Sequence, residues 1–224
     1  MIFNTLSGVI FKNGNNIKKH TRYNGLSGDD VRCGVYDTQR RYWAGTVTGI
    51  SYYDNNRWRR IREGQGLPSE DVWACALDST GTLWFGTTEG IVSIYDDMLT
   101  DRTPEIDLDT VDVRAIIAKD SRVYFGTDSG KLLIYDNDSW EILGNRYLDT
   151  GSGISAMTFD PDGVLWLGTN GDGLIRYDGK GTSRYTIKDG LPSNYVRSLA
   201  YDNGTLWMAC FGGVATLTIS ENSE

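Results

Sequence analysis

The sequence has very little histidine or cysteine and no long apolar run. Its single histidine, His20, belongs to no recognisable Ser–His or Cys–His arrangement. The sequence therefore does not indicate nucleophilic catalysis of that kind. The three cysteines, Cys33, Cys75 and Cys210, form an odd set in apolar contexts, which favours buried free thiols in a reducing compartment.

Membrane-spanning and export segments are also lacking. No apolar run approaches the ~18 residues of a membrane span, and the N-terminus has no basic region followed by an apolar core and a cleavage site. We therefore expect a cytoplasmic location for the chain as it stands, and an extracytoplasmic one if it is part of a longer protein.

Helix-favouring residues are scarce, and turn and strand formers take their place. The 224 residues include 27 Gly, 13 Tyr and 7 Trp, with many Thr and Val. This composition is typical of an all-β protein with many turns. A chain of this length can bury a substantial core.

Positive charge is concentrated at the start of the chain. Residues 1–62 hold 11 Lys/Arg and 4 Asp/Glu, a net charge of +7, whereas residues 63–224 hold 11 and 26, a net charge of −15. The overall acidity argues against binding to a nucleic acid polymer. The basic first quarter of the chain is compatible with a local anion-binding surface.

One short pattern recurs about every 41 residues. An aromatic residue in an apolar run marks each copy: Trp43, Trp84, Tyr124, Trp166 and Trp207. A period near 40 with several short strands per unit is the signature of a β-propeller with four-stranded antiparallel blades. We predict one domain over residues 1–224, with repeats at about 30–66, 71–108, 112–150, 154–190 and 195–219 and a partial blade at 1–25.

Most repeated residues are interpreted as architecture. The aromatic residues are expected to fill the core between blades. Glycines within the second strand allow close approach of a neighbouring backbone: Gly45, Gly86, Gly126 and Gly168. An aspartate is expected to cap the turn before that strand: Asp37, Asp78, Asp120, Asp160 and Asp202. Metal binding by these aspartates is not expected, because equivalent positions on separate blades lie far apart.

The stretch GLPSEDVWACALDSTGTLWFGTTEGIVSIYD at 66–96, with a second copy at 190–203 running on to Trp207, resembles the two-component regulator propeller repeat. In that family such repeats commonly form extracytoplasmic sensor domains ahead of a kinase. This chain has no kinase, membrane span or second propeller, so the resemblance implies the repeat architecture alone.

A more distant resemblance links the repeat to propeller lyases that open cyclic antibiotics. Those enzymes use a histidine and a bound metal at the propeller axis. His20 falls on a predicted outer strand, so the resemblance does not place a lyase site here.

The two ends of the chain suggest how the propeller closes. Residues 8–26 align without gaps to 49–67, so the chain starts inside one blade, and it ends after the third strand of another. Unpaired edges invite aggregation. We therefore predict five blades, with one or more N-terminal strands completing the C-terminal blade. Six blades and a strand-sharing oligomer are the alternatives to this closed monomer.

The residue after the leading Val of the first strand breaks the repeat. The series at this position is Arg32, Trp73, Arg114, Ser155 and Arg197. Guanidinium groups bind carboxylate or phosphate, and an indole face stacks on a sugar or base. These residues, together with Asn194 and Tyr195, are the candidate ligand site for a small anionic molecule. The alternative is that the arginines pair with nearby acids: Asp29, Asp30, Glu70, Asp71 and Asp112.

A second set of candidates lies on the predicted outer strands. It is a basic patch of seven residues: Lys18, Lys19, Arg22, Arg57, Arg59, Arg60 and Arg62. Edge Lys and Arg commonly prevent strand-to-strand aggregation. The functional interpretation is docking of an acidic protein partner.

These patterns favour a non-enzymatic, sensor-like or sequestering propeller that binds a nucleotide or acidic sugar. A protein-interaction platform is the first alternative, and a lyase or carboxylate-based hydrolase is the second. No catalytic residue, metal or cofactor is predicted, and no membrane contact.

Overall fold

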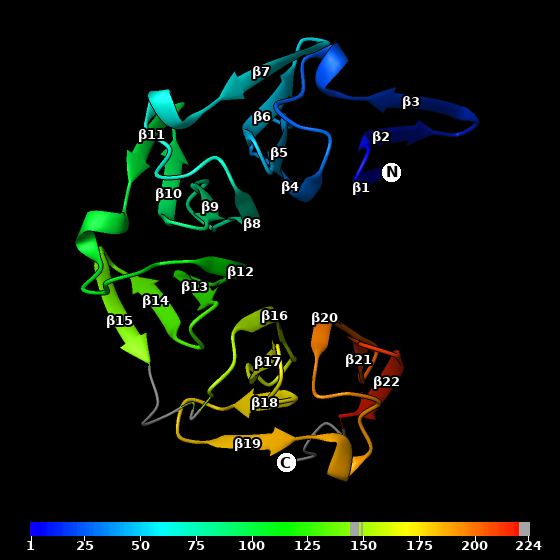
Figure 1. Ribbon diagram of the computed structural model, residues 1–224, viewed down its shortest axis with the longest axis vertical. Helices are drawn as coiled ribbons and strands as arrows, with labels where there is room; N and C mark the ends of the chain where they lie inside the picture. Colours follow the sequence, from blue (N-terminus) through cyan, green and yellow to red (C-terminus); the bar gives the residue numbers. More distant parts are fainter. Residues whose placement is uncertain (144–147, 149, 220–224) are drawn as a thin grey trace. The chain divides into compact units, whose positions relative to one another are not determined.

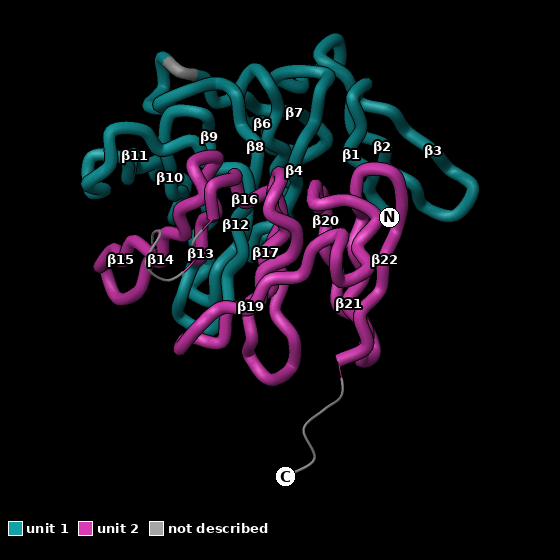
Figure 2. Tube along the Cα trace, turned by 60° about the horizontal axis from the view of Figure 1, so that its bottom comes forward, with its two compact units in different colours: residues 1–123 teal, residues 124–224 magenta. Residues whose placement is uncertain are grey.

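The computed structural model describes residues 1–143, 148 and 150–219. The described chain consists of β-strands and four short 3₁₀ helices: η1 (Arg22–Asn24), η2 (Glu63–Gln65), η3 (Thr103–Glu105) and η4 (Ile187–Asp189). None of its described helices has the length and apolar character needed to cross a membrane. The chain forms two compact units, Met1–Val123 and Tyr124–Glu224 (Figure 2).

The first three sheets belong to the first unit, and each is antiparallel (Figure 1). The first sheet contains β1 (Ile2–Thr5), β2 (Gly8–Asn13) and β3 (Asn16–His20). The second contains β4 (Val31–Tyr36), β5 (Tyr42–Thr46), β6 (Gly49–Asp54) and β7 (Arg57–Ile61). The third contains β8 (Val72–Leu77), β9 (Leu83–Thr87), β10 (Gly90–Tyr95) and β11 (Met98–Asp101).

Three further sheets follow along the chain, and the boundary between the units falls within β13. The fourth sheet contains β12 (Val113–Lys119), β13 (Arg122–Thr127), β14 (Leu132–Asp136) and β15 (Ser139–Leu143). The fifth contains β16 (Ile154–Phe159), β17 (Leu165–Thr169), β18 (Leu174–Tyr177) and β19 (Thr182–Tyr185). The last contains β20 (Val196–Asp202), β21 (Thr205–Cys210) and β22 (Gly213–Thr218).

The described chain therefore has six sheets, and the prediction of five blades was wrong while the alternative of six was right. The N-terminal strands form a sheet of their own, with Ile2 opposite Phe11 and Val9 opposite His20, and they do not complete the last sheet. The physical reason is local. Tight turns join β1 to β2 and β2 to β3, and such hairpins form without a distant partner.

Three of the repeated tryptophans fill the core as expected, whereas Trp207 of the last sheet is 48% exposed, and for that residue the expectation was wrong. Trp43, Trp84 and Trp166 are at most 3% exposed. Each indole Nε1 donates to the Oδ2 of the aspartate six residues earlier, at 2.8 to 2.9 Å. The same aspartates also cap the turn: Oδ1 of Asp160, for example, accepts from the backbone N–H of Val164. The repeat is therefore a hydrogen-bonded aspartate–tryptophan pair as well as a turn.

The glycines within the second strands allow the close approach that the sequence predicts. A Cβ added at Gly86 would lie 2.5 Å from Cγ1 of Val113, and one at Gly168 would lie 2.9 Å from Cγ1 of Val196. Both valines begin the first strand of the next sheet. The valine side chain of one sheet thus packs directly against the glycine backbone of the preceding sheet.

The three cysteines are free, as expected, but they are only partly buried. Burial raises the pKa of the Cys75 thiol, and a hydrogen bond with Cys33 adds to this effect. Burial also raises the pKa of Cys210. Thiols held in the neutral form are weak nucleophiles.

Candidate functional site

The variable position of the repeat is a β-bulge. The pairing register skips one residue between Val31 and Cys33, and again between Val72 and Ala74. The same skip occurs at Ser155 and Arg197 in the second unit. A bulged residue is released from the ladder and its side chain is re-aimed. The position that differs between repeats is therefore the one that the backbone sets apart.

In the first unit this position forms a stack of three side chains. The guanidinium carbon of Arg32 lies 3.3 Å from the centre of the Trp73 ring, and that of Arg114 lies 3.9 Å from it. Two guanidinium groups this close to one ring centre would overlap on a single face, so they lie on opposite faces of the indole. Cation–π attraction of about 0.5–2 kcal/mol per pair favours this arrangement.

Aspartates bind the outer edges of both guanidinium groups. Arg32 lies 3.0 Å from a carboxylate oxygen of Asp71 and 3.7 Å from one of Asp30. Arg114 lies 2.6 Å from Oδ2 of Asp112. All five charged side chains remain between 20% and 34% exposed. The ion pairs that the alternative interpretation expects are thus present.

The stack corrects one expectation about Trp73. Its indole was expected to offer a face to a sugar or a base, but both faces are covered by arginine. What remains partly exposed is the arginine and aspartate side chains around the ring. Such a set can hold a ligand that carries an anionic group together with hydroxyl donors.

The other predicted ligand residues lie in the second unit. Nη1 of Arg197 donates to Oδ1 of Asn170 at 3.2 Å. Asn194 has a structural task, because its Oδ1 accepts from the backbone N–H of Ile187 at the start of η4. Tyr195 is half-exposed beside a backbone bridge to Asn170. No stack like that on Trp73 is seen around Arg197 in the described residues.

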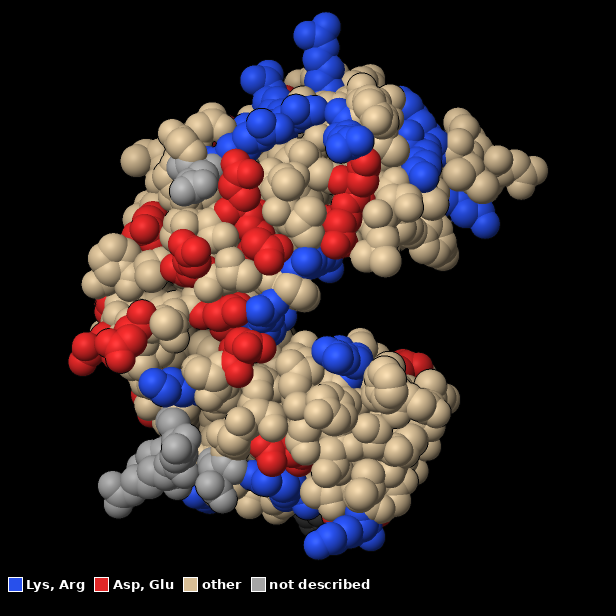
Figure 3. All heavy atoms as spheres, viewed as in Figure 1, with Lys and Arg blue, Asp and Glu red and all other residues tan. Residues whose placement is uncertain are grey.

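The basic patch lies where the sequence placed it, on the outer strands β3 and β7 and the segments that follow them. Figure 3 shows Lys and Arg side chains gathered over the region where β7 lies in Figure 1. Arg60 is anchored, since its guanidinium donates to the carbonyl oxygens of Gly25 and Arg22. Arg22 forms an ion pair with Asp29 at 3.5 Å. Lys18, Lys19, Arg57, Arg59 and Arg62 are exposed.

His20 is a core residue. It is 3% exposed, and its ring lies 4.9 Å from that of Phe11 and 5.1 Å from that of Tyr53. Burial, with a smaller contribution from Lys18, lowers its pKa below the usual 6.5. No group of three or more His, Cys, Asp or Glu that could hold a metal ion occurs among the described residues.

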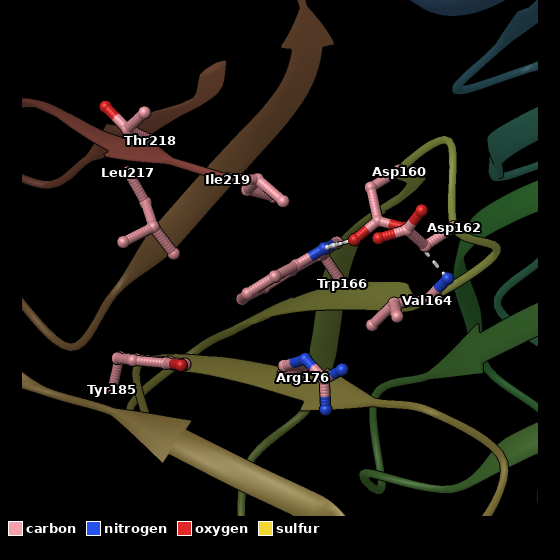
Figure 4. Close-up of a pocket in the computed structure, with 9 residues that line it drawn as sticks. All are labelled: Asp160, Asp162, Val164, Trp166, Arg176, Tyr185, Leu217, Thr218 and Ile219. Atoms are coloured by element: carbon pink, nitrogen blue, oxygen red, sulfur yellow. Dashed lines mark hydrogen bonds between the residues drawn. The ribbon is translucent and has the colours of Figure 1, made fainter. Parts of the chain in front are cut away.

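The second unit contains a pocket of about 210 Å³ that the sequence did not predict (Figure 4). Trp166, Arg176 and Tyr185 of the fifth sheet line one part of it, and Leu217 and Ile219 line another. Asp160 is bonded to the Trp166 indole on its wall.

Comparison with known proteins supports the repeat architecture. Residues 66–89 and 149–171 match the family model described as two component regulator propeller. The first match lies within the predicted copy at 66–96. The second overlaps the repeat predicted at 154–190 and not the copy at 190–203. No curated protein sequence matches the chain.

Several solved structures share the fold. The extracellular domain of the putative hybrid two component system BT3049 from B. thetaiotaomicron has a TM-score of 0.82 at 20% identity, over 96% of this chain and 31% of that one. A catalytically inactive virginiamycin B lyase from Staphylococcus aureus, determined with quinupristin, has a TM-score of 0.77 at 16% identity, over 96% and 75%. PorZ from Porphyromonas gingivalis has a TM-score of 0.69 at 18% identity, over 95% and 36%.

These similarities establish an all-β propeller fold. At 16% to 20% identity they establish the fold alone. This chain spans about a third of the length of BT3049's extracellular domain.

Proposed function

We propose that this chain, which carries two-component regulator propeller repeats, is a non-enzymatic, sensor-like domain that binds a small anionic ligand. The observation that carries the proposal is the stack of Arg32, Trp73 and Arg114 on bulged or equivalent positions. The repeats differ at these positions. A small ligand is asymmetric, so we expect it to be bound by residues that differ between the repeats.

An acidic sugar fits the stack better than a nucleotide. Its carboxylate accepts from the guanidinium N–H groups, and its hydroxyls donate to Asp30, Asp71 or Asp112. A nucleobase would need a free aromatic face, and both faces of Trp73 are covered. The two arginines offer donors to the carboxylate of such a sugar, and the three aspartates offer acceptors to its hydroxyl groups.

A thermal-shift comparison tests this function. Glucuronic and galacturonic acid should raise the melting temperature, while glucose and AMP should have a smaller effect, because binding to the folded state stabilises it by mass action. Arg114→Ala should abolish the shift, and Arg57→Ala, on an exposed outer strand, should keep it. If Arg114→Ala misfolds, Arg32→Lys keeps the charge but loses the planar fork. A shift unchanged in both variants contradicts the site.

The proposal places the domain outside the cytoplasm. The part of BT3049 that this fold matches is an extracellular domain. The expectation of a cytoplasmic location has no support among these comparisons.

The basic patch supports a second candidate function, docking of an acidic protein. Lys18, Lys19 and Arg59 are exposed on neighbouring outer strands and are free to make such contacts, whereas Arg60 is anchored to the backbone. Reversing these three residues to Glu should abolish binding of a labelled poly-glutamate peptide in fluorescence anisotropy. Lys180→Glu, in the second unit, is the control. Equal binding by both variants contradicts this function.

A further inference from the structure

The second and third sheets each place a cysteine in the interface between them. Cys33 lies on β4 and Cys75 on β8, the first strands of the two sheets, which lie side by side within the first unit (Figures 1 and 2). Both side chains are partly buried and pack against one apolar cluster, which contains Trp43 of the second sheet and Phe85 of the third. The two thiols thus share one environment although they come from different repeats.

Strand register shows which way Cys33 faces. It stands two residues before Val35, which pairs with Trp43, so these three side chains lie on one face of the second sheet. Gly45 is the partner of Cys33 on β5. An added Cβ at Gly45 would lie 2.5 Å from Sγ of Cys33 and 2.6 Å from Cγ1 of Val72 in β8. The face that carries Cys33 is therefore turned toward the third sheet.

Cys75 approaches from the other side of the same interface. It pairs with Phe85 of β9, so the two side chains lie on one face of the third sheet. The ring of Phe85 lies 6.1 Å from that of Trp43, so this face is turned toward the second sheet. A side-chain hydrogen bond joins Cys75 to Cys33. The two thiols thus meet where the first strands of adjacent sheets approach each other.

The same strand positions carry no thiol in the fifth and last sheets. Ala156 of the fifth sheet corresponds to Cys33, because it pairs with the glycine of the second strand, Gly168. Leu199 of the last sheet corresponds to Cys75, because it pairs with Met208, the residue after the repeated tryptophan. The fold therefore does not require a thiol at either position.

We propose that Cys33 and Cys75 form a reversible disulfide that joins the second sheet to the third under oxidising conditions. Each thiol gives up one electron and one proton. With hydrogen peroxide as the oxidant, the sulfur of Cys33 attacks one peroxide oxygen and becomes a sulfenic acid, and one water is released. The sulfur of Cys75 then attacks the sulfenic sulfur, and a second water is released as the S–S bond forms.

The order of these steps follows from the burial of Cys75. Burial raises the pKa of its thiol, and the hydrogen bond with Cys33 adds to this effect, so Cys75 stays protonated near neutral pH. Cys33 is therefore the first nucleophile, because the thiolate is the reactive form. The disulfide ties β4 to β8, the strands that carry Arg32 and Trp73. Its formation needs no ligand, so this proposal is independent of the proposed ligand binding.

Peptide mapping of the full chain by mass spectrometry tests the link. The chain is reduced, freed of reductant, treated with hydrogen peroxide and alkylated after denaturation. Trypsin separates the three cysteines, because arginines lie between them. The peptide of Cys33 should be joined to that of Cys75, whereas Cys210 should carry the alkyl group. Dithiothreitol should restore both thiols, and the same oxidation in urea should give mixed pairs among all three cysteines.

Cysteine variants provide matched controls for the pair. Cys33→Ala should abolish the link, and it should fold, because Ala74 and Ala156 stand at the same position in the third and fifth sheets. Cys75→Ser should abolish the link as well. Cys210→Ala removes the third thiol and should leave the yield of the link unchanged. Circular dichroism verifies that each variant is folded.

Either of two results would overturn the proposal. The first is recovery of Cys33 and Cys75 from the folded, oxidised chain as alkylated or singly oxidised residues, because the two sulfurs would then be held too far apart to bond. The second is a folded chain that gives the same mixture of pairs as the chain in urea, since the fold would then not select this pair.

Discussion

At the scale of single residues, the repeat is held by a buried carboxylate that serves two groups at once. In the fifth sheet, Oδ1 of Asp160 accepts from the turn and Oδ2 accepts from the Trp166 indole. In the second sheet, burial alone would raise the pKa of Asp37, but hydrogen bonds from Trp43 and Arg41 lower it overall. The carboxylate ties the hairpin turn to the core residue that the turn precedes.

Asp160→Asn should therefore destabilise the protein. The new amide puts an NH₂ group or a single oxygen where two acceptors are needed, so either the indole N–H or the turn N–H loses its bond. We expect the free energy of unfolding to fall by about 1–3 kcal/mol in urea titrations. Asp162→Asn, an exposed position in the same turn, should change it by less than about 0.5 kcal/mol. Equal effects would show that the indole bond is unimportant.

His20 should make stability depend on pH. Its folded-state pKa lies below the usual 6.5 because of burial first and Lys18 second. The folded state thus disfavours the proton, so its contribution is fully present above about pH 6.5 and is lost as the pH falls below that value. Urea titrations at pH 7.5 and 5 should show a larger loss for the wild type than for His20→Phe. Parallel losses would contradict this.

At the scale of strands and sheets, a small residue decides how closely neighbours pack. Gly86 stands in β9 against Val113 of the next sheet, and the corresponding position of the last sheet is Ala209. Ala209 is exposed. Trp207, two residues before Ala209, is 48% exposed, although the equivalent tryptophans Trp43, Trp84 and Trp166 are at most 3% exposed. Glycine is therefore found where another sheet's first strand packs against it.

Gly86→Ala should lower stability by about 1–3 kcal/mol, since the added methyl group would lie 2.5 Å from Cγ1 and 2.7 Å from Cβ of Val113, and overpacking a core costs that much. Gly64→Ala is the matched control, because an added Cβ there meets nothing within 4 Å. Its effect should be neutral or slightly stabilising. Thermal unfolding of both variants checks the difference, and similar melting temperatures would contradict the packing argument.

At the scale of the whole molecule, the sequence predicted the repeated sheets but not the features that occur only once. Trp spacing, turn aspartates and strand glycines predict the sheets, because the strands and turns of each repeat are determined by residues within that repeat. The number of sheets was mispredicted because the short β1 carries no repeat signal. It pairs with β2 through a local turn and so contributes to a separate first sheet. The bulge at Arg32 and the stack on Trp73 involve side chains about 41 residues apart, so periodicity could identify the position but not the cation–π geometry.

Sheets that contact only their neighbours should unfold locally. Leu206 belongs to a core cluster shared by the fifth and last sheets, and Leu83 holds the same position in a cluster shared by the second and third. Leu206→Asp places a charge in the core that the fifth and last sheets share, so amide exchange should accelerate in β16–β22 while β8–β11 stay protected. Leu83→Asp should expose β4–β11 together, because both sheets lose their shared core. Hydrogen exchange read by mass spectrometry distinguishes the two patterns. Uniform loss of protection in Leu206→Asp would instead mean that the chain unfolds as a single cooperative unit.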